Sequence, residues 1–396
     1  MNLKRTLASL GCMVLLTVTL TGGIAGNVSH ITPVCFSETM EEGNTMTAIE
    51  FAAEMKIGWN LGNTFDAPLG ETAWGNPVTT KELLLKVKEL GFETIRIPIS
   101  WGKHVSPAPE YAIDEGFLNR VDAVVNDALD AGLHVIINSH HDNEIYMPTP
   151  ENSQQAKAYL TAIWTQIGNH FINAPYSLVF ETMNEPRVVG TSYEWGIDYK
   201  NPDCMAAVEV VNELNQAALD AIRSTGGKNA DRFVMISPYA AAPGSAVASS
   251  FRLPEDSVDG KLMVSVHSYT PYSFALDIHS DDTDFGRKDE NEIRSILKSV
   301  NHRFVEKGIP VVIGETGCLN KSNPEDRYAW AKTFVSAARE YGIPCIWWDN
   351  GQINGSQENF GLIDRKSVSV YEQSQTVYQG LMDGLIAELF QQTGES

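Results

Sequence analysis

Tyr176-Ser177-Leu178-Val179-Phe180 and Ile309-Pro310-Val311-Val312 are two short apolar stretches, and each runs into a glutamate motif. The first is followed by Asn184-Glu185-Pro186 and the second by Ile313-Gly314-Glu315-Thr316-Gly317. Compact apolar runs of this length, bounded by Gly and Pro, are typical of buried strands. Two carboxylates that follow two strands so far apart in sequence predict one shared site, formed at strand ends by a barrel or a doubly wound sheet.

Six more segments have the same character, so the sequence holds eight candidate strands. They lie at residues 57–60, 94–97, 134–138, 178–180, 233–236, 262–267, 311–314 and 345–348. Near-continuous apolar runs are typical of parallel strands that are covered on both faces. Helical patterns separate them, at residues 80–90, 115–131, 153–171, 205–224, 290–307 and 324–341, with a last one from about 369 to 390. Only residues 237–260 are less regular, with a weak helical pattern.

The number of repeats decides between the two architectures. Eight strand–helix units fit a closed (β/α)8 barrel, whereas a doubly wound sheet usually has fewer strands and a glycine-rich phosphate loop after the first. The sequence contains neither G-x-G-x-x-G nor G-x-x-x-x-G-K-[ST]. We therefore predict an α/β fold, a single (β/α)8 TIM barrel that spans residues 47–392.

The first 26 residues have the pattern of a secretory signal peptide. Lys4 and Arg5 precede an apolar run at residues 13–20, and small residues at 22–26 offer a cleavage site. The alternative is an uncleaved anchor, but the run is well short of the roughly 20 residues that a membrane span needs. We predict export to the extracellular space, with residues 27–46 as a linker or disordered arm.

Composition narrows the range of partners and of cysteine chemistry. The formal charge of −21 disfavours nucleic acid and anionic membranes and fits a protein that acts on a neutral polymer. Of the five cysteines, Cys12 lies in the signal, and the others form no C-x-x-C motif. A bridge between Cys318 and Cys345 is conceivable, but buried free thiols are the stronger expectation because a chain of this size does not need disulfides.

Polar residues gather at the expected carboxyl ends of seven strands, where barrels carry their active sites. They are Asn60 and Asn63, Arg96, His140, His141 and Asp142, Asn184 and Glu185, His267 and Tyr269, Glu315, and Trp348 and Asp349. Chance would place one or two polar residues there. Glu185 and Glu315 in particular provide the pair of carboxyl groups that cleavage of a glycosidic bond requires.

Each of these residues also has a structural interpretation. Either glutamate alone could be a solvated loop residue, and Arg96, inside an apolar run, must be paired if it is buried. His140 and His141 could bind zinc, but no third His or Cys stands at metal spacing, and we predict no metal and no cofactor. Six tryptophans are either core residues or platforms for sugar rings, and Trp348 is the strongest candidate for a platform. They are Trp59, Trp74, Trp101, Trp195, Trp347 and Trp348.

The ordered set of motifs resembles the cellulase-type members of glycoside hydrolase family 5, in its clostridial endoglucanase branch. The motifs are Gly58-Trp59-Asn60-Leu61-Gly62-Asn63-Thr64, Ile95-Arg96-Ile97-Pro98, Asn138-Ser139-His140-His141-Asp142, Asn184-Glu185-Pro186, Val266-His267-Ser268-Tyr269, Ile313-Gly314-Glu315, Trp347-Trp348-Asp349-Asn350-Gly351 and Glu358-Asn359-Phe360-Gly361-Leu362-Ile363-Asp364-Arg365. The resemblance covers roughly residues 47–390. Thr316 departs from it, since many relatives carry Phe there.

The resemblance implies a retaining hydrolase with Glu185 as acid/base and Glu315 as nucleophile. Asn184 would hold the sugar 2-hydroxyl, and Arg96 and Tyr269 would hydrogen-bond Glu315. His140 and His267 would position the acid/base and the substrate, and Trp348 would form the floor beneath the reacting sugar. His141, Asn63 and Trp59 complete the expected substrate-binding and supporting set. Glu185 must start protonated, so a raised pKa is expected for it.

The function expected from this resemblance is that of a secreted endo-β-1,4-glucanase acting on cellulose and related β-glucans. Xyloglucanase, mixed-linkage glucanase, mannanase and xylanase activities are alternatives on the same scaffold. A non-catalytic carbohydrate-binding barrel is an alternative of another class. The expected partner is a β-glucan polysaccharide, with no nucleic acid, no membrane after signal cleavage, and a monomeric state.

Overall fold

The computed structural model describes residues 45–354 and 358–387, all within the compact unit Met40–Ser396. The predicted signal peptide and nearly all of the predicted linker therefore lie outside the described residues. Within the described ranges, no helix combines the length and the apolar character that crossing a membrane requires.

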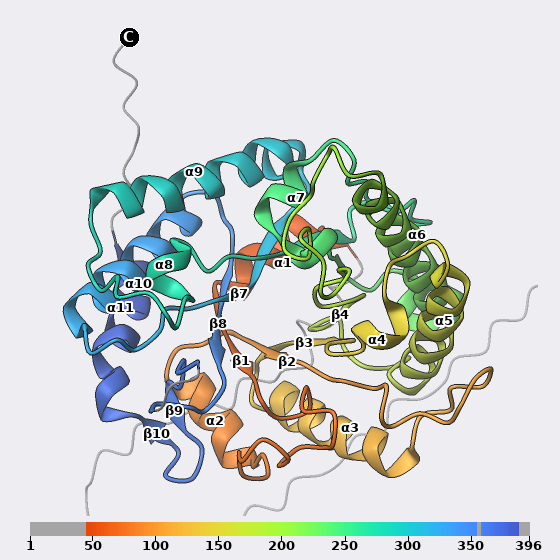
Figure 1. Ribbon diagram of the computed structural model, residues 1–396. Helices are drawn as coiled ribbons and strands as arrows, with labels where there is room; N and C mark the ends of the chain where they lie inside the picture. Colours follow the sequence, from red (N-terminus) through yellow and green to blue (C-terminus); the bar gives the residue numbers. More distant parts are fainter. Residues whose placement is uncertain (1–44, 355–357, 388–396) are drawn as a thin grey trace, which may run out of the picture. The chain divides into compact units, whose positions relative to one another are not determined.

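Eight parallel strands close into a barrel in sequence order, which confirms the predicted fold (Figure 1). They are β1 (Ile57–Leu61), β2 (Thr94–Ile97), β3 (His134–Asn138), β4 (Leu178–Glu181), β5 (Val234–Ile236), β6 (Leu262–His267), β7 (Val311–Thr316) and β8 (Cys345–Asp349). The barrel closes where β1 pairs with β8, with Trp59 opposite Trp347. All eight predicted strands are present, and most of their bounds agree with the prediction to within a residue.

Helices surround the barrel, and the long ones cover the outer faces of the strands (Figure 1). They are α1 (Ala48–Met55), α2 (Lys81–Glu89), α3 (Glu115–Asp130), α4 (Asn143–Tyr146), α5 (Ser153–His170), α6 (Pro202–Ser224), α7 (Pro243–Val247), α8 (Tyr272–Ala275), α9 (Arg287–Arg303), α10 (Pro324–Arg339) and α11 (Gln375–Ile386). Short 3-10 turns lie at η2 (Gly227–Ala230), η3 (Tyr239–Ala241), η4 (Val305–Lys307) and η5 (Glu372–Ser374). A small hairpin, β9 (Ile363–Asp364) with β10 (Ser369–Val370), occupies the start of the last predicted helix.

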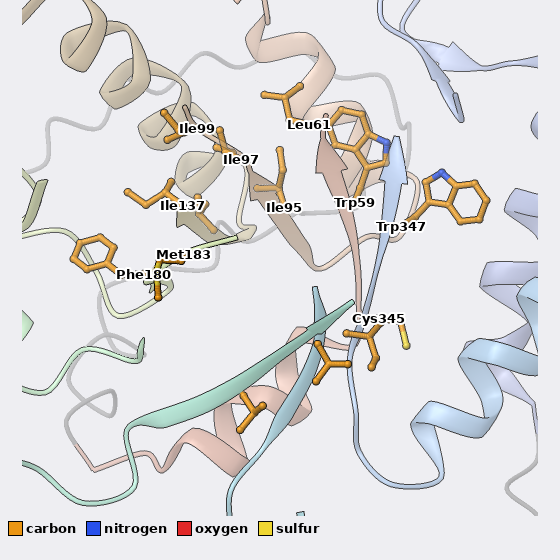
Figure 2. Close-up of a cluster of buried hydrophobic side chains, with 14 of the residues drawn as sticks. Trp59, Leu61, Ile95, Ile97, Ile99, Ile137, Phe180, Met183, Cys345 and Trp347 are labelled. Carbon is orange, nitrogen blue, oxygen red and sulfur yellow. The ribbon is translucent and has the colours of Figure 1, made fainter. Parts of the chain in front are cut away.

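The outer faces of the strands build the main core between barrel and helices. Alternate residues such as Ile95 and Ile97 on β2 point outward into this core, which also contains Trp59 and Trp347 (Figure 2). Successive side chains of a strand point to opposite faces. Thr94 and Arg96, which alternate with Ile95 and Ile97 along β2, therefore face the barrel interior. The same alternation therefore places polar side chains inside the barrel.

The amino end of the barrel is closed by α1, which the sequence analysis did not predict. Thr47 begins the helix with a capping box: its hydroxyl accepts from the Glu50 backbone N–H, and the Glu50 carboxylate accepts from the Thr47 N–H. Phe51 and Met55 on its buried face pack against a set of interior side chains that we call the barrel floor. The barrel floor consists of Ile136, Val179, Phe233, Met235, Met263, Val312 and Ile346.

The described cysteines confirm the expectation of free thiols. Cys204, Cys318 and Cys345 are unpaired and buried, and burial raises the pKa of the Cys318 thiol to about 11. Cys318 and Cys345 do not form the bridge that their neighbouring strands made conceivable. Cys35 lies outside the described residues.

Candidate active site

A cleft of about 1370 Å³ opens at the carboxyl ends of the strands. It is lined by the predicted catalytic and substrate-binding residues except Arg96 and Trp59, whereas Asn60, Asp142 and Asp349 are buried behind it. These lining residues are Asn63, His140, His141, Asn184, Glu185, His267, Tyr269, Glu315 and Trp348. Side chains from loops after strands on opposite sides of the barrel thus meet in one place, as the strand-end pattern predicts.

Glu315 lies at an irregularity in the barrel wall. The register of β7 shifts against both neighbours, so that Glu315 lies opposite His267 on β6 while Thr316 lies opposite Trp347 on β8. Such irregularities re-aim a side chain at a sheet edge. The Glu315 carboxylate accepts a 2.8 Å hydrogen bond from Arg96 on one oxygen and a 3.0 Å bond from the Tyr269 hydroxyl on the other. Both contacts were expected from the resemblance.

Arg96 lies directly beneath the cleft and is fully buried. Its guanidinium donates to Glu315, to the Asn60 side chain at 3.0 Å, to the Asn184 side chain at 2.7 Å and to Glu181 at 2.8 Å. Burial opposes the charge, but the two carboxylates outweigh it and raise the pKa of Arg96. The prediction that a buried Arg96 must be paired is confirmed.

Glu181 is the functional residue that the sequence analysis missed. It is the last residue of β4 and is fully buried, and it accepts from Arg96, from the Asn138 amide at 2.9 Å and from the Ser265 hydroxyl at 2.5 Å. The predicted strand ended one residue earlier, and the apolar residues around Glu181 hid it. The signal that could have found it is the need of Arg96 for a buried anionic partner.

The pKa of Glu185 is shifted in the direction opposite to the one expected. Its carboxylate lies 2.7 Å from His267 Nδ1 and 3.4 Å from Arg187. Burial favours the neutral acid, but the hydrogen bond and charge of His267, with the charge of Arg187, outweigh it and lower the pKa of Glu185. For His267, burial is outweighed by Glu315 and Glu185, and its pKa is raised. In the free protein these directions favour a carboxylate at Glu185 and the shared proton on His267.

His140 is held as a neutral imidazole in a single tautomer. Its Nδ1 lies 3.1 Å from the amide nitrogen of Asn138, whose orientation is fixed because its oxygen accepts from the Ile99 N–H. Nδ1 must therefore accept, and Nε2 carries the hydrogen and lies 3.9 Å from Glu315. Burial, with nearby positive charge, keeps the pKa of His140 well below its usual range. The ring stacks parallel to Trp348 at 5.8 Å.

Two groups of side chains bring possible metal ligands within 4.8 Å of one another: Asp66, His140 and His141, and Glu185, His267 and Glu315. The tautomer of His140 disfavours the first, because a protonated Nε2 cannot coordinate a metal. The Asp66 carboxylate is also engaged by the backbone N–H groups of Asn63 and Thr64. In the second group the proton between Glu185 and His267 competes with a cation. Neither arrangement favours a metal centre over acid–base chemistry.

Trp59 was predicted to belong to the substrate-binding and supporting set, and its buried position favours the supporting role. Its side chain is 0% exposed, packs in the outer core (Figure 2) and donates a 2.7 Å hydrogen bond to Asp349. Asp349 also accepts from the backbone N–H groups of Gly351, Leu362 and Ile363. Through Asp349, Trp59 therefore supports the end of β8, which carries Trp348, and the loop that follows it.

The remaining predicted aromatic and polar residues divide between cleft and core. Trp74 and Trp195 line the cleft and are 42% and 59% exposed, whereas Trp101 and Trp347 are core residues. Asp142, predicted at the mouth, is buried and accepts from the backbone N–H groups of Trp101 and Gly102. Its role is to hold the loops after β2 and β3 together.

Comparison with known proteins places this site in a family. Residues 53–354 match the family described as Cellulase (glycosyl hydrolase family 5). The chain is 44% identical over 342 residues to cellulase/esterase CelE of Acetivibrio thermocellus, covering 86% of this chain and 40% of that protein. It is 39% identical over 344 residues to endoglucanase A of Ruminococcus albus, covering 85% of this chain and 92% of that protein.

A solved structure shows the same relation. The structure of a GH5-4 broad specificity endoglucanase from Ruminococcus champanellensis with bound cellotriose superposes with a TM-score of 0.80 at 40% identity, covering 85% of this chain and 98% of that one. The fold, the site and these similarities agree with one another. The chain belongs to glycosyl hydrolase family 5, the cellulase family.

Proposed function

We propose that the protein is a retaining endo-β-1,4-glucanase that hydrolyses cellulose and related β-glucans by double displacement. The observation that carries this proposal is the separation of the two carboxylates. A carboxylate oxygen of Glu185 lies within 4.8 Å of one of Glu315. Retaining glycosidases hold their carboxyl groups about 5–5.5 Å apart, and inverting enzymes need about 6.5–9.5 Å to admit a water molecule between carboxylate and sugar.

In the first step Glu315 attacks the anomeric carbon while Glu185 gives a proton to the departing glycosidic oxygen. Arg96 and Tyr269 hold both oxygens of Glu315 and aim it at the sugar. The proton is available although the pKa of Glu185 is lowered, because the pair of Glu185 and His267 holds one. Transfer of that proton from His267 to Glu185 across 2.7 Å produces the acid when a neutral substrate displaces water.

In the second step the same groups work in reverse. Glu185, now a carboxylate, accepts a proton from water, and the resulting hydroxide attacks the anomeric carbon and releases Glu315. His267, which gave up its Nδ1 proton in the first step, can take up the new proton from Glu185 afterwards. The Asn184 amide, fixed by Arg96 through its oxygen at 2.7 Å, keeps its nitrogen for the sugar 2-hydroxyl.

The cleft supports a neutral polysaccharide as substrate. Exposed rings of Trp74 and Trp195 lie in the same cleft as Trp348 and offer stacking surfaces beyond a single sugar ring. The names of the relatives, endoglucanase among them, favour a β-glucan over mannan or xylan. A xyloglucanase or mixed-linkage glucanase remains the nearest alternative. A non-catalytic binding barrel is disfavoured because both carboxylates are held in place.

We also propose that the protein is secreted. The basic Lys4 and Arg5, the apolar run at residues 13–20 and the small residues that follow support this. N-terminal sequencing of protein recovered from culture medium tests it, with a mature end near residue 26 expected. A mature protein that retains residues 1–26 would contradict secretion by signal cleavage.

The enzymatic proposal is tested by the anomeric form of the first product and by a substrate panel. Proton NMR of cello-oligosaccharide hydrolysis is expected to show the β-anomer first, with the α-anomer appearing only by mutarotation. Carboxymethylcellulose, mixed-linkage glucan, xyloglucan, xylan and mannan form the panel, with Glu315→Ala as the control preparation. We expect rapid loss of viscosity with carboxymethylcellulose. Initial α-anomer would overturn retention, and activity on mannan alone would overturn the substrate.

A further inference from the structure

Arg187 is a charged residue next to the proposed proton donor, and neither the sequence patterns nor the mechanism above gives it a role. It lies two residues after Glu185 in the loop that follows β4, with its side chain only 13% exposed. Its guanidinium donates to the Glu185 backbone carbonyl at 3.1 Å and lies 3.4 Å from the Glu185 carboxylate. Arg187 thus contacts both the main chain and the reactive group of the same residue.

Two residues of the same loop fix the position of the Arg187 side chain. Its Nε donates to the Glu194 carboxylate at 3.1 Å, and its guanidinium stacks on the Trp195 ring at 4.0 Å. The other oxygen of Glu194 accepts from the Gly190 N–H at 2.8 Å, which closes the loop on itself. Trp195 lines the cleft and stays 59% exposed, so Arg187 covers part of the ring and the rest is left for a ligand.

The loop lies across the barrel from Trp348. Trp348 belongs to β8, and the loop of Arg187 follows β4, four strands away in the closed barrel. Trp195 and Glu185, the proposed donor to the departing oxygen, belong to the same loop after β4 and line the same cleft, so Trp195 lies toward the leaving group. Arg187 therefore lies between a stacking surface for the leaving group and the residue that protonates it.

Resting on the proposed function, we propose that Arg187 is a positioning residue for the proton donor: braced by Glu194 and Trp195, it directs the Glu185 carboxyl toward His267 and makes the proton of that pair easier to release. The positive charge favours the deprotonated pair, which helps the transfer of a proton to a weakly basic glycosidic oxygen. Glu194 limits this effect, since its negative charge partly neutralises Arg187.

Other groups also face Glu185 and set the background for this effect. His267 on β6 and His141 after β3 face Glu185 directly, Arg96 on β2 and Glu315 on β7 face its partner His267, and Glu358 lies after β8. The phenols of Tyr146 and Tyr269 face it too, but burial raises the pKa of each well above its usual value, so they stay neutral. Arg187 differs from the other cations in being braced by residues that belong to the cleft wall, not to the barrel interior.

The test is the pH dependence of kcat/KM on a cello-oligosaccharide, whose alkaline limb reports loss of the donated proton. Arg187→Met keeps the packing on Trp195 and removes the charge, and we expect the limb to move up by about 0.5–1 pH unit. Arg187→Lys should restore most of the wild-type profile. Glu194→Gln leaves Arg187 unneutralised, and its limb should move down. Arg252→Gln, an exposed cation outside the cleft, is the matched control and should leave the limb in place.

Opposite shifts for Arg187→Met and Glu194→Gln support the proposal, because a merely structural loop would not move the limb in two directions. An unmoved limb, or the same direction for both, overturns it, and Glu194→Gln decides the matter alone if Arg187→Met does not fold. Glu185→Ala, assayed on an aryl cellobioside with an activated leaving group, separates the two proposals. If Glu185→Ala loses the alkaline limb and Arg187→Met does not shift it, only the proposed role of Arg187 is overturned. If Glu185→Ala keeps the alkaline limb, the role of Glu185 as proton donor is overturned as well.

Discussion

The two ends of the barrel are made from the same eight strands but differ in chemistry. At the amino end, α1 covers the barrel floor, in which Phe51 packs on Phe233 with a ring separation of 4.4 Å. At the carboxyl end, the barrel interior holds a buried network of charged and amide groups. In that network Arg96 joins Glu181 to Glu315.

This difference indicates how the fold divides its tasks. Apolar contacts between α1 and the barrel floor stabilise the closed barrel because they remove apolar surface from water. The network at the mouth holds charges out of water, which is costly unless every partner is present, but it fixes the carboxylates before substrate arrives. We therefore expect substitutions at the mouth to act first on catalysis and substitutions at the floor to act on stability alone.

The largest expected effect is that of Glu315→Gln at the mouth. Gln keeps an oxygen acceptor for Arg96 and can donate its amide N–H to the Tyr269 oxygen, but it cannot form the glycosyl intermediate, so kcat on cellotetraose should fall by about 10⁴-fold or more. Stability should also fall, but by less than in Glu181→Gln, because Glu315 borders the cleft and Arg96 keeps its bond to the fully buried Glu181. A residual rate within about 100-fold of wild type would break the comparison, since the mouth would then not depend on its nucleophile.

Glu181→Gln should affect both properties at once. It leaves the Arg96 charge with one carboxylate partner instead of two, and urea unfolding should show a loss of about 3–5 kcal/mol in stability. Activity should also fall, because Arg96 would no longer be fixed beneath Glu315. Glu209→Gln, which breaks an exposed pair with Arg252, is the control and should cost less than about 1 kcal/mol. Equal losses in the two variants would remove the argument for a buried network.

Phe51→Ala tests the floor by itself. Phe51 is 3% exposed, and its loss opens a cavity beneath the barrel, so the free energy of unfolding should fall by about 3–4 kcal/mol. At 25 °C the kcat and the pH profile of the folded enzyme should stay as in wild type. A large fall in kcat without loss of folded protein would show that the floor and the mouth are coupled.

The smallest expected effect is that of substituting His134. The pKa of His134 is shifted down, whereas that of His267 is shifted up. His134 begins β3 at the amino end, where burial, with the charge of Lys88, lowers its pKa to about 4. A lowered pKa in the folded state means that this contribution to stability is complete above about pH 6.5 and is lost as the pH falls toward 4. His134→Gln should remove about 1–3 kcal/mol of this acid destabilisation, measured by urea unfolding at pH 7 and pH 4.5. The same pH dependence in variant and wild type would contradict a half-buried, neutral His134.

The mouth was more predictable from sequence than the floor. Arg96, Glu185 and Glu315 stand out because ionisable residues in or just after apolar runs are rare and need partners. α1 was missed because residues 48–55 were given no role beyond the start of the barrel domain, although Thr47 and Glu50 form a capping box that is readable in the sequence.

Two features of the mouth depend on the fold in the same way. Trp59 was predicted as a substrate-binding or supporting residue, and the barrel register decides between the two roles because it turns the Trp59 side chain to the outer core. The pKa of Glu185 was expected to be raised, but the 2.7 Å contact with His267 depends on two strands that only the fold brings together. A motif identifies the residue, and three-dimensional neighbours decide which way it points and where its proton resides.

The central claim, that Glu315 is the nucleophile of a retaining enzyme, is tested most directly by trapping the intermediate. The mature protein would be incubated with 2,4-dinitrophenyl 2-deoxy-2-fluoro-β-cellobioside, and the products analysed by intact-mass and peptide mass spectrometry. We predict one fluorocellobiosyl group per chain, attached to Glu315 in the peptide that contains it, with inactivation in step with labelling. Labelling at Glu185 or another residue, or turnover with inversion and no adduct, would contradict the account.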